Sequence, residues 1–205
     1  METKNVYRIA KFEKVSKEEY EKTIQKMMEE NRFLNREDFV DYDEIKLPKR
    51  STAKSAGYDI YAGMNITQKT IKDFGKINTM IENGGHAPHY VIHNIGIMVP
   101  TFVKCRIEDN WMLSIYPKSG LATKKHAVLM NTVGIIDADY YNNENNEGHI
   151  LVPLVFDDLY EYGKKDTPSI EKNTKLVQGI FTMYGITEDD DCDEVRTGGF
   201  GSTGV

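Results

Sequence analysis

The chain has 205 residues, 40% of them hydrophobic and 28% charged, which is enough for one domain with a buried core. Its net charge of -6 argues against a general nucleic-acid binder but allows a small anionic ligand held by a local cluster of donors. Cys105 and Cys192 show no metal-site or disulfide spacing, and no apolar run approaches the roughly 18 residues of a membrane span, so we expect a cytoplasmic protein without signal peptide or membrane contact.

Residues 16–31, SKEEYEKTIQKMMEEN, are typical of a helix. Ser16 and Glu19 have the spacing of a capping box. The apolar side chains of one stripe follow at helical spacing: Tyr20, Ile24, Met27 and Met28. Pro48, within KLPKRSTAK, then marks a boundary. We therefore predict an N-terminal extension with a helix over residues 1–46 and a main domain over residues 47–195.

The main domain is predicted to be all-β. Short β-rich segments separated by turn signals favour a sandwich or barrel. The clearest segments are residues 58–66, 90–99, 111–117, 126–136, 149–156 and 174–184. Between them, ENGGHAPHY in the 72–90 excursion has the composition of a turn at the tip of a hairpin.

Two of the strands carry a polar residue among apolar neighbours. Asp59 lies between Tyr58 and Ile60 in SAGYDIYA, where Gly57 permits a close approach of another group. A single acid on a strand is more often a satisfied surface or turn group than a functional one. Gln178, in KLVQGIF, must find hydrogen-bond partners if it is buried.

The stretch YPKSGLA, residues 116–122, is a candidate anion site. Pro117 ends a strand, and the turn at Ser119 and Gly120 would open a short helix. Free backbone N–H groups at such a turn, with Lys118 and the Ser119 hydroxyl, can bind an anion. A plain turn is the alternative.

The stretch NTVGIIDADYYNN, residues 131–143, places Asp137 at the end of an apolar strand. A carboxylate fixed there can orient and deprotonate a water molecule. Tyr140 follows three residues later and could lie flat beside it. The alternative is an Asx-type turn that ends a hairpin.

The last ten residues, RTGGFGSTGV, follow the acidic run EDDDCDE and are predicted to form a mobile arm on a solvated tether. The formal GxGxxG cannot be a dinucleotide fingerprint, because no helix can follow it. Its glycines, Ser202 and Thr203 can nevertheless approach a phosphate, Arg196 can fork onto phosphate oxygens, and Phe200 can stack on a base. A frayed terminus is the alternative.

The histidines fit no standard metal motif. A zinc site built from His86, His89 and His93 is an alternative, although their spacing matches neither HExxH nor a metal finger. No GxSxG elbow and no Walker motif are present.

Taken in order, AGYDIYA, PKSGLA, NTVGIIDADY, KLVQ and GGFGSTG closely resemble the five motifs of the homotrimeric dUTP diphosphatases (dUTPases), over about residues 47–205. The resemblance implies a jelly-roll-like β-barrel or sandwich and a homotrimer with shared active sites. It also implies that residues 196–205 form a lid that closes a neighbour's site and excludes water.

The resemblance further implies Mg²⁺-dependent hydrolysis of dUTP to dUMP and pyrophosphate. Asp137 would activate the water that attacks the α-phosphorus. Tyr140 would pack against the deoxyribose and exclude a 2′-hydroxyl. Asn131 and Gly134 would lie in the hairpin that reads uracil and rejects the 5-methyl group of thymine, which requires a rigid pocket.

The remaining roles implied by the resemblance concern phosphates and metal. Lys118, Ser119 and Gly120 would bind phosphates, with Gln178 close by. Asp59 would hold a water on the Mg²⁺ ion, which otherwise binds triphosphate oxygens and waters. The lid would consist of Arg196, Phe200, Gly201, Ser202 and Thr203.

The chain departs from the family pattern in three places. Lys118 replaces the usual arginine, so a planar fork becomes a point charge. The loop YNNENNE, residues 141–147, is inserted before Gly148, and Arg196 lies one residue nearer to Phe200 than is common. Two other functions stay open: dCTP deamination on the same fold, and a dUTP-sensing regulator that presents its extra segments to a protein partner.

Overall fold

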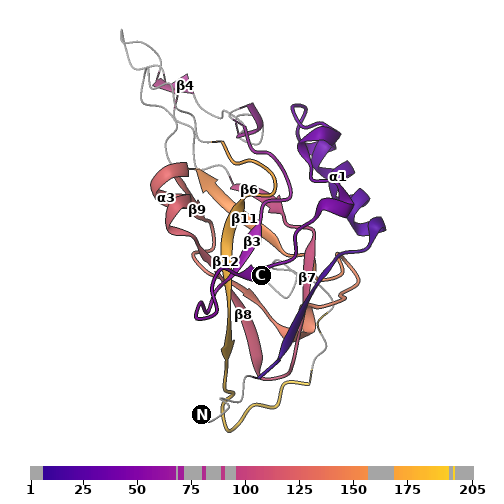
Figure 1. The fold of residues 1–205 in the computed structure, drawn as a ribbon, viewed down its shortest axis with the longest axis vertical. Coiled ribbons are helices and arrows are strands. Elements are labelled where there is room, and N and C mark those ends of the chain that lie inside the picture. The colour runs from indigo at the N-terminus through magenta and orange to yellow at the C-terminus, as the bar shows by residue number, and fades with distance from the viewer. Residues whose placement is uncertain are drawn as a thin grey trace.

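Two long antiparallel strands, β8 (Trp111–Pro117) and β12 (Lys175–Met183), form the centre of the largest sheet (Figure 1). The computed structural model describes residues 7–67, 69–71, 80–81, 89–90, 96–156, 169–193 and 196. In register, Gln178 lies opposite Tyr116 and Met183 opposite Trp111. β3 (Tyr58–Tyr61) and then β2 (Lys49–Arg50) extend the sheet beyond β12, and β10 (Gly134–Ile136) extends it beyond β8.

A second sheet has three antiparallel strands in the order β6, β11, β9. These are β6 (Gly96–Pro100), β11 (Leu151–Phe156) and β9 (Ala127–Leu129). Along β11 every second side chain is buried, namely Val152, Leu154 and Phe156. This period of two gives the sheet one face that packs into the core.

The N-terminal segment is tied to the strands by a third ladder. β1 (Ala10–Lys14) pairs antiparallel with β7 (Val103–Ile107). Helix α1 (Lys17–Glu30) follows, and the hydroxyl of its N-cap Ser16 accepts a hydrogen bond from the Glu19 N–H, which is one half of the predicted capping box. The other half does not form, because the Ser16 N–H donates to Glu147 instead of Glu19. Buried residues from before position 46 and buried residues from the strands form one core cluster. The predicted domain boundary at residue 46 stays a prediction.

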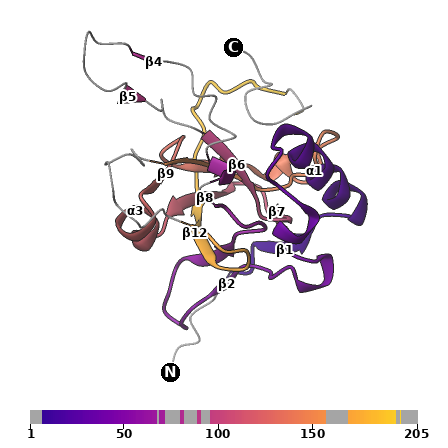
Figure 2. The same cartoon turned by 90° about the horizontal axis from the view of Figure 1, so that it is seen from above.

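The buried face of α1 consists mainly of the apolar stripe predicted from the sequence. Tyr20, Ile24 and Met27 are buried, and Met28 packs against the same core. Short 3-10 turns follow at Arg36–Asp38 (η1) and Tyr42–Glu44 (η2). Helix α3 (Ser119–Lys125) lies on the opposite side of the strands from α1 in both views (Figures 1 and 2). None of the described helices is long and apolar enough to cross a bilayer.

The prediction of one strand over residues 126–136 was wrong. β9 ends at Leu129, and the chain turns through Thr132, whose φ of 63° is left-handed, before β10 starts at Gly134 in the other sheet. The Asn131–Thr132 turn thus divides one apolar run between two sheets. Strands β1 and β7 were not predicted either. The expected hairpin in the 72–90 excursion agrees with the pairing of β4 (Met80–Ile81) with β5 (His89–Tyr90).

The fold is therefore mostly β-sheet with a few helices, rather than strictly all-β.

Candidate active site

Asp137 lies directly after β10, at the N-cap of the short turn η3 (Ala138–Tyr140). Pairing of β10 with β8, with Ile136 opposite Leu113, fixes the strand that ends there. The Asp137 side chain is 42% exposed, so in this chain the carboxylate is open to water. The Asp137 side chain makes no cap hydrogen bond to η3, so the alternative of an Asx-type turn is not supported.

Arg196 makes an ion pair with each of two aspartates of η3. Its Nη2 lies 2.5 Å from Asp137 Oδ2, and its Nε lies 3.0 Å from Asp139 Oδ1. The guanidinium carbon lies 5.8 Å from the centre of the Tyr140 ring, within cation–π range. Arg196, predicted to belong to the lid, therefore contacts the proposed base, whereas the contact with Asp139 was not predicted.

A cavity of about 200 Å³ lies next to this turn. Four predicted site residues line it: Asn131, Gly134, Tyr140 and Arg196. Its remaining lining is apolar and comes from β8, β9, β10 and β11. A small planar base suits such a pocket, because apolar side chains line it together with the Asn131 amide and the Gly134 backbone. The structure thus brings the predicted base-reading hairpin and the predicted sugar-packing tyrosine together.

Tyr140 is buried, and its hydroxyl is hydrogen-bonded from two sides. It donates to the carbonyl of His149 at 3.0 Å and accepts from Asn146 Nδ2 at 2.8 Å. Burial raises the pKa of this phenol above its ordinary value, despite the Asn146 hydrogen bond and the nearby Arg196 charge. The phenol therefore stays neutral and its ring stays in one orientation.

The other predicted group gathers where β3, β12 and the start of α3 meet. Asp59 is buried, and its oxygens contact Lys118 Nζ at 2.5 Å, Lys175 Nζ at 2.6 Å and the Ser51 hydroxyl at 2.5 Å. Burial alone would raise the pKa of Asp59, but these three hydrogen bonds outweigh it and hold the pKa well below its usual range. Asp59 is therefore an ionised carboxylate that pairs with two lysines and offsets the charge of one of them.

Gln178 lies opposite Asp59 in the ladder between β12 and β3. A Cβ on Gly57 would come within 2.8 Å of the Gln178 Oε1, so glycine permits the close approach expected there. Lys118 is the N-cap residue of α3, which starts at Ser119, as the predicted short helix required. Lys175 and Ser51 were missed from the sequence, because nothing local distinguishes them from other polar surface residues.

The two groups lie far apart on one chain. β3 and β10 are separated by β8 and β12, which amounts to three strand spacings of about 4.8 Å each, or about 14 Å. Along β8, the positions opposite Gln178 and Ile136 are Tyr116 and Leu113, about 10 Å apart. One chain therefore places Asp137 and Tyr140 in one half-site and Asp59, Lys118 and Gln178 in another.

Part of the predicted site cannot be placed. Phe200, Gly201, Ser202 and Thr203 lie outside the described residues, as do His86 and His93 and the side chain of His89. Within the described ranges, no group of three or more His, Cys, Asp or Glu side chains could hold a metal ion. Cys105 is buried and Cys192 exposed, and both are free thiols.

Curated relatives of this chain decide its family. A deoxyuridine 5′-triphosphate nucleotidohydrolase of Lactococcus lactis is 36% identical over 164 residues, which cover 78% of this chain and 89% of the relative. The chain belongs to the dUTPase family. Another such dUTPase, from Caulobacter vibrioides, is 32% identical over 167 residues, which cover 79% of this chain and 88% of the relative. No protein-family model matches the chain.

Solved dUTPase structures resemble this one. The dUTPase of Streptococcus mutans is 31% identical with a TM-score of 0.51, over 74% of this chain and 94% of that one. The dUTPase of the S. aureus phage phi11 is 15% identical with a TM-score of 0.52, over 92% and 98%. The second likeness concerns the fold alone, but it extends over more of this chain. Members of the dUTPase family use Mg²⁺.

Proposed function

We propose that this dUTPase hydrolyses dUTP to dUMP and pyrophosphate, with Asp137 as the base that activates the attacking water. The observation that carries the proposal is the position of Asp137, fixed at the end of β10 beside the cavity that Asn131, Gly134 and Tyr140 line. A carboxylate that is open to water can accept the proton of that water as it attacks the α-phosphorus.

The cavity supports recognition of a small base and its sugar. Uracil would enter between the Asn131–Gly134 turn and the apolar walls, and Tyr140 would pack against the deoxyribose. Because the Tyr140 hydroxyl is held from two sides, the ring cannot easily yield to a 2′-hydroxyl group. Rejection of one small group by packing depends on that rigidity.

The second half-site supports binding of the phosphates. Lys118, Ser119 and Gly120 form the start of α3, and Gln178 lies on the adjacent strand β12. Lys118 carries its charge partly exposed to solvent, so a phosphate oxygen can compete with Asp59 for it. A lysine in place of the family arginine still supplies the charge, although without the planar fork.

The described donors suit a Mg²⁺ ion that the substrate brings with it. No cluster of three acids or histidines lies in the described parts, and Asp59 already holds Lys118 and Lys175. This set fits an ion bound by triphosphate oxygens and waters, with Asp59 holding one water once the phosphates draw Lys118 away. When bound, the ion supplies positive charge against the departing pyrophosphate.

The separation of the half-sites supports a shared site in a homotrimer. With about 14 Å between β3 and β10, the phosphate-binding group of one chain would face the Asp137 group of another. Residues 196–205 would act as the lid. In the single chain Arg196 contacts its own Asp137, and in the trimer a neighbour's Arg196 would take this place.

The test is a pyrophosphate-release assay on dUTP, UTP, dTTP and dCTP, with and without Mg²⁺, alongside sedimentation of the protein. We expect rapid release from dUTP with Mg²⁺, little from the other nucleotides, and a particle with three times the mass of one chain. Ammonia released from dCTP would instead favour the deaminase alternative. Tight dUTP binding without pyrophosphate would favour the regulator.

A further inference from the structure

The inserted loop 141–147 supplies a direct contact to Tyr140. Asn146, near the end of this loop, donates from Nδ2 to the Tyr140 hydroxyl at 2.8 Å. The loop then returns through Gly148, whose φ is 79°, and a Cβ there would come within 2.5 Å of the Tyr140 carbonyl oxygen. The loop therefore closes tightly against the tyrosine backbone and contacts its phenol.

The orientation of the Asn146 amide is fixed by its own oxygen. Asn146 Oδ1 accepts from Asn143 Nδ2 at 2.9 Å and from the Gly148 N–H at 3.2 Å. An oxygen that receives two donors must face them, so the NH₂ group faces Tyr140. Asn143 is itself fixed, because its Nδ2 also donates to the Tyr140 carbonyl and its Oδ1 receives two backbone N–H groups.

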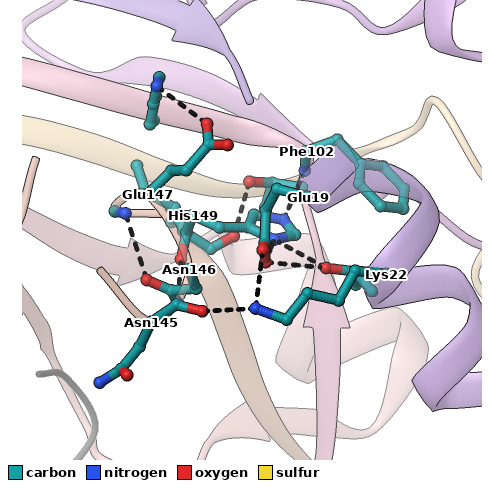
Figure 3. Close-up of polar contacts among 12 residues, drawn as sticks. Glu19, Lys22, Phe102, Asn145, Asn146, Glu147 and His149 are labelled. Carbon is teal, nitrogen blue, oxygen red and sulfur yellow. Dashed lines mark hydrogen bonds and ion pairs between the residues drawn. The ribbon is translucent and has the colours of Figure 1, made fainter. Parts of the chain in front are cut away.

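The loop is anchored to the N-terminal helix. The Glu147 carboxylate accepts from the Ser16 hydroxyl and, at 3.0 Å, from the Ser16 N–H, directly at the start of α1. Lys104 on β7 donates to the same carboxylate at 3.0 Å. Figure 3 shows Lys22 reaching from α1 to the Asn145 carbonyl, a contact of 2.7 Å.

His149 fixes the other end of the same region. Its Nε2 accepts from the Phe102 N–H at 2.9 Å, and its Nδ1 lies 3.9 Å from the Glu19 carboxylate (Figure 3). Burial lowers the pKa of His149 below its ordinary value, although Glu19 opposes this. The ring is therefore neutral, and the His149 carbonyl that receives the Tyr140 hydroxyl is held by a buried, ordered residue.

We propose that Asn146 is a positioning residue for sugar selection: it holds the Tyr140 ring where it excludes a 2′-hydroxyl. This rests on the proposed function, in which Tyr140 packs against the deoxyribose. Without Asn146, the phenol loses this donor while the hydrogen bond to the His149 carbonyl remains, and the ring can tilt away from a ribose. The inserted loop, which lies outside the five motifs, thereby contributes to specificity.

The experiment measures kcat and KM for dUTP and for UTP in the full-length protein with Mg²⁺. Asn146→Ala should lower the dUTP-to-UTP ratio of kcat/KM about three- to tenfold, the effect of one lost hydrogen bond. Most of the change should be a lower KM for UTP. A purely structural role would reduce the active fraction equally for both nucleotides and leave the ratio unchanged.

The matched control is Glu144→Ala in the same loop. Glu144 is exposed and makes neither of the described hydrogen bonds to the Tyr140 hydroxyl, so the ratio should stay at the wild-type value. A second arm compares Tyr140→Phe with and without Asn146→Ala. If Asn146 acts through the hydroxyl, adding Asn146→Ala to Tyr140→Phe should leave the ratio unaltered.

Two outcomes would overturn the inference: an unchanged ratio in Asn146→Ala, or an equal fall in the Tyr140→Phe background. Both are distinct from failure of the proposed function, because that failure would appear in the wild-type protein as no pyrophosphate release from dUTP.

Discussion

The guanidinium of Arg196 lies 2.5 Å from the carboxylate of Asp137, a residue 59 positions earlier in the chain. The same side chain reaches Asp139 at 3.0 Å, so its planar fork joins both acids of the η3 turn. The only described residue of the C-terminal arm therefore lies against the proposed catalytic base. Arg196 therefore gives the arm a docking position beside Asp137. Because Asp137 and Asp139 contact different nitrogens of Arg196, the two carboxylates can be tested separately.

Asp137→Asn should lower kcat for dUTP by about 10²- to 10⁴-fold, because it removes the proton acceptor. Binding of dUTP should be nearly intact, since the amide has the same shape. Pyrophosphate release and calorimetric titration measure the two quantities. Asp139→Asn is the control, because it alters the same Arg196 fork but keeps the base; we expect it to retain turnover within about tenfold. Comparable turnover in Asp137→Asn would remove this residue from the mechanism.

A chain ending at residue 195 should keep its fold and assembly but lose nearly all activity, because the lid can no longer exclude water from the site. The described core contains no residue from this arm, so thermal unfolding should shift little. Circular dichroism melting and sedimentation check the first part, and pyrophosphate release checks the second. Unchanged activity would refute the lid assignment.

Asp59→Asn should lower the free energy of unfolding at pH 7 by about 1.5–3 kcal/mol, the range for hydrogen bonds to charged groups. The pKa of Asp59 is depressed in the folded chain, so its stabilisation is present above the ordinary value of 3.8 and is lost as the pH falls below it. Urea unfolding at pH 7 and pH 3 should therefore show a smaller difference between wild type and variant at pH 3. A difference that grows in acid would contradict this ionic arrangement.

Gly148→Ala should destabilise the protein by at least about 2 kcal/mol. The position has a left-handed φ of 79°, and the added Cβ would meet the Tyr140 carbonyl oxygen at 2.5 Å, which is backbone and cannot move aside. Gly185→Ala is the control, because nothing lies within 4 Å of its Cβ position. It should change stability by no more than about 0.5 kcal/mol. Equal effects of the two changes in urea unfolding would show that the loop is not packed as described.

The sequence predicted best what local pattern controls. The capped, striped helix at Ser16 and the strand ends at Pro117 and Asp137 follow from spacing and turn residues within a few positions. The partners of Asp59 could not be predicted, because Ser51 and Lys175 reach it only after distant strands have paired. The role of Asn146 was hidden for the same reason.

The pairing of strands that are distant in the sequence could not be predicted either. The segments of β1 and β7 alternate apolar with charged side chains, and neither is distinctive alone. Their register, with Ala10 opposite Ile107, depends on contacts across almost a hundred residues. Pairing over that distance is decided by the whole core rather than by local propensity.

The ladder between β1 and β7 also bears on how this protein can be shortened. Among the described strands, β7 has β1 as its sole ladder partner, from Lys14 opposite Val103 to Ala10 opposite Ile107. Removal of the amino terminus up to the first motif would expose the backbone donors and acceptors of β7 that now pair with β1. An unpaired strand edge of this kind promotes edge-to-edge aggregation. Residues 10–14 therefore protect the edge of β7, and expression of soluble protein should depend on keeping them.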